Sequence, residues 1–211
     1  MTTITAGDGV KLEARWDRPE GPRHTIVVLC HPHPLYGGTM DAPLVVSITR
    51  YLVEYGFAVL RFNFRGVGGS DGAWGGGTAE VHDVAGAVAA AAAEADADGV
   101  DLGVAGWSFG AATSLRWQAA SRSTIPWAGI APPVRLDPRF ALPEPAALAP
   151  ARRLFVIGDR DQYTAPGDLT DYAVEARARI EVLRGSDHFF YFRERVVGGL
   201  VAAHLAGRPQ A

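Results

Sequence analysis

The chain has 211 residues, 48% of them hydrophobic, and a formal net charge of −3 at pH 7. This length and apolar content suit one sizeable core, so we expect a single domain over residues 1–211. Lys11 is the only lysine, no basic cluster marks a nucleic-acid or anionic-membrane surface, and no stretch approaches about 18 uncharged apolar residues. Because the first residues also lack a signal-peptide pattern, the sequence predicts a cytoplasmic protein without nucleic-acid or membrane partners.

Three strands are predicted at the start of the chain. Segments 2–5 and 10–16 flank a Gly-Asp-Gly turn and predict an antiparallel hairpin, and the apolar run 25–29 predicts a buried strand. Cys30, the only cysteine, ends that run, so we expect a buried side chain and no intrachain disulfide.

The segment 30–41 is too rich in proline and glycine for a helix. It follows a predicted strand, at the edge where open α/β sheets bind ligands. His31 and His33 could suggest a metal site, but no third ligand follows at a suitable spacing, so we expect none. Asp41, which precedes Ala42-Pro43, predicts the N-cap of a helix that extends to about residue 55.

A second glycine-rich loop, 65–72, follows the apolar strand predicted at 57–62. The loop could suggest a phosphate cradle, but Asp71 stands where the dinucleotide pattern needs glycine. No Gly-Lys-[Ser/Thr] sequence follows it either, so we expect no nucleotide cofactor. An alanine-rich helix is predicted to begin near residue 78 and to end near residue 95.

The rest of the chain is organised around Gly106-Trp107-Ser108-Phe109-Gly110. The apolar run 102–105 predicts a strand before this pentapeptide, and the sequence after it predicts a helix. A strand-to-helix turn with this Gly-x-Ser-x-Gly pattern is typical of a nucleophile elbow, in which a serine is exposed at the tip of a sharp turn. Ser108 is therefore the candidate nucleophile.

Strands and helices alternate after the elbow. The predicted elements are a helix at 109–120, a strand at 125–130, a proline-rich segment at 131–150, a strand at 153–157, a helix at 169–178, a strand at 179–183 and a helix at 192–205. This alternation predicts an α/β fold with a mostly parallel, doubly wound sheet. Six prolines in the segment 131–150 leave no room for a multi-helix insertion.

A serine nucleophile needs a base and an orienting acid. His188 and Asp161 both follow predicted strands, so a parallel sheet brings them to the same edge as Ser108. Their order along the chain, nucleophile then acid then base, is the order that this kind of fold uses. Asp159 is the main alternative acid and Asp187 a weaker one.

These motifs together resemble the α/β-hydrolase superfamily. The resemblance rests on His31–Pro34 with Gly37-Gly38, on the Ser108 elbow, and on Gly158-x-x-Asp161 and Gly185-x-x-His188. The chain is most similar to small lidless serine hydrolases with a His-Pro-His-Pro loop, and more distantly to dienelactone hydrolases. The resemblance implies a sheet without a cap domain. It also implies an oxyanion hole formed by the backbone N–H of Phe109 and that of His33, or of Leu35 because Pro34 has no N–H.

The motifs predict a serine hydrolase that cleaves a small carboxylic ester with a short to medium acyl chain through an acyl-enzyme on Ser108. A thioesterase, a peptidase, or a non-catalytic scaffold that binds a ligand are the alternatives. Aromatic residues near the catalytic positions are candidates for substrate contact, namely Tyr36, Trp74, Trp107, Phe109, Tyr163 and Phe189. We expect no cofactor and no metal, and the oligomeric state stays open.

Overall fold

The computed structural model describes residues 1–134 and 141–207. Within them, eight strands form one sheet in the order β1-β2-β4-β3-β5-β6-β7-β8. The strands are β1 Thr2–Thr5, β2 Lys11–Asp17, β3 Thr25–Cys30, β4 Phe57–Phe62, β5 Asp101–Trp107, β6 Trp127–Ile130, β7 Arg153–Gly158 and β8 Arg179–Leu183.

The sheet is mostly parallel, as predicted. The hairpin β1-β2 is antiparallel, and β2 joins the sheet through an antiparallel pairing with β4. All pairings from β4 to β8 are parallel. The carboxyl ends of β5, β7 and β8 therefore lie at one edge, which is where the sequence places the three candidate catalytic residues.

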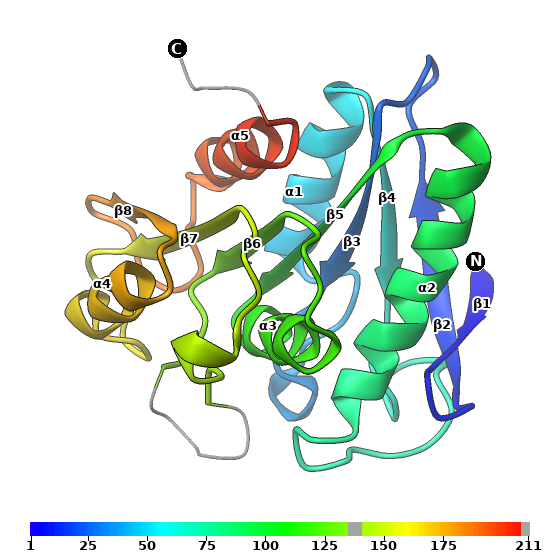
Figure 1. Ribbon diagram of the computed structural model, residues 1–211, viewed down its shortest axis with the longest axis horizontal. Helices are drawn as coiled ribbons and strands as arrows, with labels where there is room; N and C mark the ends of the chain where they lie inside the picture. Colours follow the sequence, from blue (N-terminus) through cyan, green and yellow to red (C-terminus); the bar gives the residue numbers. More distant parts are fainter. Residues whose placement is uncertain (135–140, 208–211) are drawn as a thin grey trace.

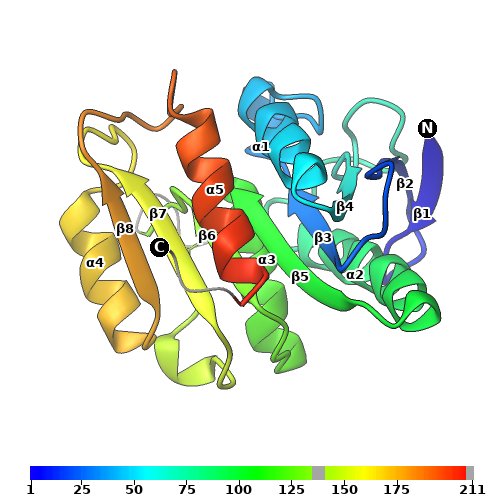
Figure 2. The same cartoon turned by 90° about the horizontal axis from the view of Figure 1, so that it is seen from above.

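Helices cover both faces of the sheet. They are α1 Pro43–Glu54, α2 Glu80–Asp98, α3 Phe109–Ser121, α4 Pro166–Glu175 and α5 Glu194–Leu205. Figures 1 and 2 show α1 and α5 on one face and α2, α3 and α4 on the other. Each face has its own apolar core, and the fully buried strands β3, β4 and β7 contribute side chains to both.

The burial of whole strands explains why they read as continuous apolar runs in the sequence. Strand β4 has the predicted limits, and Cys30 is fully buried at the end of β3, where desolvation raises the pKa of its thiol. Strand β6 is two residues shorter than predicted, since Pro126 has no N–H for the ladder. Helix α4 begins three residues early because Pro166 occupies its first turn.

Two local predictions were wrong. The N-cap of α1 is Ala42, without a side-chain hydrogen bond, because Pro43 already occupies the first helical position. Asp41 lies one residue too early to cap; its carboxylate instead accepts a hydrogen bond from Nη1 of the buried Arg61 at 3.0 Å. The loop at 30–41 also contains one 3-10 turn, Pro34–Tyr36, where the sequence predicted no helix.

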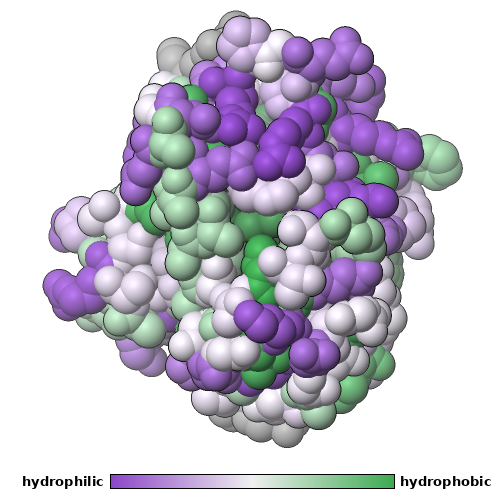
Figure 3. All heavy atoms as spheres, turned by 90° about the vertical axis from the view of Figure 1, so that its right-hand side faces the viewer, coloured by the Kyte–Doolittle hydropathy of each residue, from purple (hydrophilic) through white to green (hydrophobic). Residues whose placement is uncertain are grey.

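The proline-rich segment between β6 and β7 contains no helical cap in its described part. Its one helical element outside residues 135–140 is a 3-10 turn, Pro145–Ala147. Pro138, one of the six prolines behind the prediction, lies outside the described residues. Figure 3 shows the side of the molecule around β1 and β2, where hydrophilic residues crowd the upper part of the surface and hydrophobic residues form a band near its centre. In the described ranges no helix is long and apolar enough to span a membrane.

Candidate active site

Ser108 lies at a sharp turn between β5 and α3. Its backbone has φ 53° and ψ −119°, a conformation that costs energy for any residue with a Cβ atom. The backbone N–H of Ser108 donates to the carbonyl of Ile130 at 2.7 Å, which holds the turn against β6. The side chain is partly exposed. This is the geometry expected of a nucleophile elbow.

The glycines on either side make this turn possible. A Cβ atom at Gly106 would lie 2.5 Å from the carbonyl carbon of Gly110, inside van der Waals contact. A Cβ atom at Gly110 would collide with the backbone carbonyls of Cys30 and His31. The start of α3 is therefore packed directly on the loop that follows β3, which brings two parts of the site together.

His188 and Asp161 form the hydrogen bond that the sequence predicts. The ring nitrogen Nδ1 of His188 lies 2.8 Å from Oδ2 of Asp161, and both side chains are buried. The other oxygen of Asp161 accepts the backbone N–H groups of Tyr163 and Thr164, each at 2.9 Å. Because a carboxylate oxygen accepts, the bond to Oδ2 places the ring proton of His188 on Nδ1 and leaves Nε2 as the basic nitrogen.

The imidazole of His188 is held beside the elbow by Trp107. The indole N–H of Trp107 donates to the carbonyl of His188 at 3.2 Å, and the two ring centroids lie 5.9 Å apart. Because Trp107 immediately precedes Ser108, this bond ties β5 to the loop after β8. The ring of Tyr163 packs edge-on against His188 at 4.8 Å. Sequence reasoning missed the nearby Gln162, whose side chain accepts the backbone N–H of His188 at 3.3 Å.

The two rival carboxylates have local structural roles. Asp159 accepts the backbone N–H of Gly185 at 2.7 Å, which joins the loops that follow β7 and β8. Asp187 accepts the N–H groups of Phe189 and Phe190 within its own turn. Of the three candidates, only Asp161 is hydrogen-bonded to His188.

The loop after β3 lies against the start of α3. The ring of His33 is 5.0 Å from that of Phe109 and 4.7 Å from that of Trp74. The backbone N–H of Leu35 donates to Nδ1 of His33 at 3.2 Å, inside the 3-10 turn. This bond occupies the N–H of Leu35, so in this geometry Leu35 does not present a free donor for an oxyanion.

The candidate substrate contacts differ in exposure. Tyr36 is 86% exposed and Tyr163 is 49% exposed, while Phe189 is partly buried between Trp107 and Tyr191. Trp107 is only 6% exposed and packs in the core. Tyr36, Tyr163, Phe189 and the partly exposed Trp74 thus have surface to offer a ligand, whereas Trp107 and Phe109 are buried, and Trp107 supports the backbone of His188.

His31 anchors this loop rather than binding a metal. Its ring is fully buried, and its Nε2 accepts the backbone N–H of Phe64 at 3.0 Å. The other nitrogen, Nδ1, donates to the carbonyl of Pro32 at 2.6 Å. Both nitrogens are therefore engaged in a neutral ring, and burial lowers the pKa of His31 to about 4.

This burial makes stability depend on pH. In the unfolded chain His31 has a pKa near 6.5, so the unfolded state binds a proton below that pH. In the folded state the ring stays neutral until the pH falls to about 4, so protonation favours the unfolded state between these two pH values. The stabilisation is present above pH 6.5 and is lost as the pH falls. Urea unfolding should show wild type losing about 2 kcal/mol more than His31→Asn between pH 7 and pH 5. Equal losses in the two proteins would show that His31 is charged in the folded state.

The fold and the elbow define an α/β-hydrolase with no helical lid among the described residues, and comparison with known proteins agrees. Residues 8–134 match the family model described as X-Pro dipeptidyl-peptidase (S15 family). An uncharacterized protein from Rickettsia prowazekii is 30% identical over 194 residues, which cover 87% of this chain and 79% of that protein. The chain belongs to the S15 family within the α/β-hydrolase superfamily.

Solved structures of two bacterial hydrolases are similar over nearly the whole chain. An α/β serine hydrolase without lid from Xanthomonas campestris superposes with a TM-score of 0.83 at 29% identity, covering all of this chain and 95% of the other. An α/β serine hydrolase homologue from Coxiella burnetii gives a TM-score of 0.80 at 30% identity, covering 97% of this chain and 96% of the other. A Pyrococcus furiosus esterase, 21% identical, shares the fold with a TM-score of 0.80 over 98% of this chain and 91% of its own.

Proposed function

We propose that the protein is a serine esterase that hydrolyses small carboxylic esters through an acyl-enzyme on Ser108. The observation that carries this proposal is the buried hydrogen bond between Asp161 and His188, tied through Trp107 to a serine at a strained elbow. A hydrogen-bonded Asp-His pair beside an exposed serine is the arrangement that activates a hydroxyl for attack on a carbonyl.

In the proposed reaction, Nε2 of His188 takes the proton of Ser108 as its oxygen attacks the ester carbonyl. Asp161 stays ionised and stabilises the imidazolium. The oxyanion of the tetrahedral intermediate accepts the backbone N–H groups of Phe109 and His33. His188 then gives its proton to the departing alcohol, and a water activated by the same ring releases the acid from Ser108.

The open position of the site suggests a limit on the acyl chain. The rim contains exposed side chains such as Tyr36 and Tyr163, and the described residues include no helical cap over it. A short chain can be buried there, with a gain of about 0.8 kcal/mol per methylene. A long chain would extend into water and would gain nothing from further carbons.

We therefore expect kcat/KM to peak for p-nitrophenyl esters with acyl chains of roughly two to eight carbons. No rate jump should occur where a substrate exceeds its solubility limit, because residues 1–134 and 141–207 form no helical lid that could open. A chain-length series from acetate to palmitate, with each ester measured below and above that limit, tests both expectations. Preference for the sixteen-carbon ester, or activation at an interface, would contradict an open site.

Peptide hydrolysis is the second candidate, because the matching family model is described as an X-Pro dipeptidyl-peptidase. That match ends at residue 134, before Asp161 and His188. An Xaa-Pro p-nitroanilide, a p-nitrophenyl ester and an acyl thioester, assayed side by side, separate peptidase, esterase and thioesterase by their kcat/KM values. Turnover of none of the three would favour a ligand-binding scaffold.

We also propose that residues 1–211 act as one catalytic domain in the cytoplasm. Both apolar cores pack on a single sheet, which supports one folding unit. The one cysteine is an unpaired thiol, which suits a reducing compartment.

A further inference from the structure

A cavity of about 600 Å³ lies away from the catalytic edge, at the start of β7. One wall is the 3-10 turn that ends the proline-rich segment, with Pro145, Ala146 and Leu148. The opposite wall is the carboxyl end of α4, and Arg153 lies between the two walls. Since Arg153 begins β7 and Asp161 follows its other end, the cavity and the catalytic residues lie toward opposite edges of the sheet.

Arg153 is the unusual feature of this cavity. The residue is only 4% exposed, and its guanidinium donates to two neutral acceptors, Oε1 of Gln118 and the carbonyl of Ala149, each at 2.7 Å. Its third nitrogen, Nη1, has no hydrogen-bond acceptor among the described residues, and no described carboxylate pairs with it. Burial lowers the pKa of this guanidinium, as expected for a desolvated and unneutralised cation.

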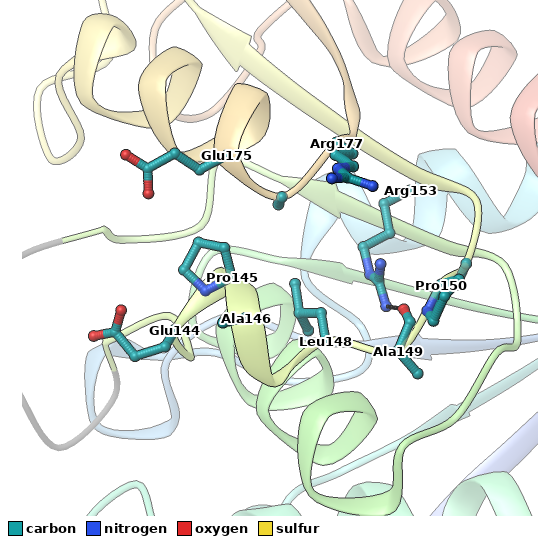
Figure 4. A pocket seen from close by; sticks show the side chains of 11 residues that line it. Glu144, Pro145, Ala146, Leu148, Ala149, Pro150, Arg153, Glu175 and Arg177 are labelled. Atoms are coloured by element: carbon teal, nitrogen blue, oxygen red, sulfur yellow. Dashed lines mark hydrogen bonds between the residues drawn. The ribbon is translucent and has the colours of Figure 1, made fainter.

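The other charged side chains of the cavity are separated by sign. Figure 4 shows the carboxylates of Glu144 and Glu175 on the far side of the cavity, away from the guanidinium of Arg153. Arg177 lies on the same side as Arg153 and adds a second positive charge. The surfaces between the two sides are proline, alanine and leucine side chains. The cavity thus combines apolar walls with a buried positive end.

From this arrangement we propose that the cavity is a second binding site, separate from the esterase site, for a small carboxylate with an apolar stem. The carboxylate would accept a charge-assisted hydrogen bond from Nη1 of Arg153 and would neutralise the buried charge. The apolar stem would lie against Pro145 and Leu148. This inference goes beyond the proposed esterase activity and does not depend on it.

The test uses sodium hexanoate as the probe and the full chain labelled with ¹⁵N. Titration followed by amide NMR should give saturable shifts at residues 144–153 and 175–177. Hexylammonium chloride and 1-hexanol have the same stem and should bind at least about tenfold more weakly, because neither can pair with Arg153. Shifts confined to the surroundings of Ser108 and His188, equal binding of the three probes, or no saturation would overturn the proposal.

Two variants locate the site independently. Arg153→Gln should weaken hexanoate binding by about tenfold or more, because it removes the charge. Ala146→Trp places a large side chain on the wall of the cavity and leaves Arg153 unchanged, so it should have the same effect even if Arg153→Gln does not fold. Ala147→Trp is the matched control, since Ala147 is also exposed on the same turn but does not line the cavity. Unchanged binding in Ala146→Trp, or equal losses in Ala146→Trp and Ala147→Trp, would contradict the assignment.

Discussion

Ser108→Ala and His188→Ala should each reduce the hydrolysis of p-nitrophenyl butyrate by about 10³-fold or more, to near the background rate. The serine supplies the atom that bonds to the acyl carbon, and the histidine moves its proton, so the loss of either removes the same pathway. The double variant should be no slower than either single variant, because residues that act as a unit give non-additive losses.

The matched control for this result is Ser186→Ala. Ser186 is a buried serine in the loop before His188, and its hydroxyl has no hydrogen-bond partner in the part of the chain that the structure describes. Its removal should leave kcat within a few-fold of wild type. If Ser108→Ala keeps more than a tenth of the activity while its circular dichroism is unchanged, Ser108 is not the nucleophile.

Asp161→Asn should lower kcat by about 10²- to 10⁴-fold, whereas Asp159→Asn should change it only a few-fold. An amide at residue 161 can donate to Nδ1 of His188, which moves the ring proton to Nε2 and blocks proton transfer from Ser108. An amide at residue 159 should not affect the ring of His188, because the exposed carboxylate of Asp159 accepts the backbone N–H of Gly185 instead.

The same pair of variants serves as its own control for folding. Both substitutions are isosteric and remove one charge near the end of β7, so similar melting temperatures are needed before the rates are compared. If Asp159→Asn lowers kcat more than Asp161→Asn does, Asp161 is not the carboxylate that orients His188 during the reaction.

Much of the fold could be predicted because buried parallel strands are continuous apolar runs. The segment 57–62 shows this, since its limits in the sequence and in the structure agree. Strand order could not be predicted in the same way. Strand β4 lies between β2 and β3 only because of long-range pairing, and no local pattern records that pairing. The early start of α4 and the true N-cap of α1 also depended on single prolines, Pro166 and Pro43, whose effect the periodicity does not show.

The sequence indicated the nucleophile and the base of the candidate site, but not the hydrogen bonds that hold them in place. The spacing of the motifs indicated Ser108 and His188, but Asp159 and Asp161 follow the same strand, and only the turn geometry decides which one accepts from His188. The backbone N–H of Leu35 donates to a ring nitrogen of His33 inside a 3-10 turn. The sequence did not predict this turn, because the prolines of the segment indicated an irregular loop. Trp107 looked like a substrate contact because it neighbours Ser108, yet as the last residue of β5 it belongs to the core.

Reaction with a fluorophosphonate probe, read by intact-protein mass and peptide mapping, tests most directly whether Ser108 is an activated nucleophile. We predict one adduct per chain, located on Ser108, absent in Ser108→Ala and formed far more slowly in His188→Ala and Asp161→Asn. Asp159→Asn should be labelled at the rate of wild type. No adduct on the wild-type chain, or an adduct on another residue that persists in Ser108→Ala, would contradict the proposed mechanism.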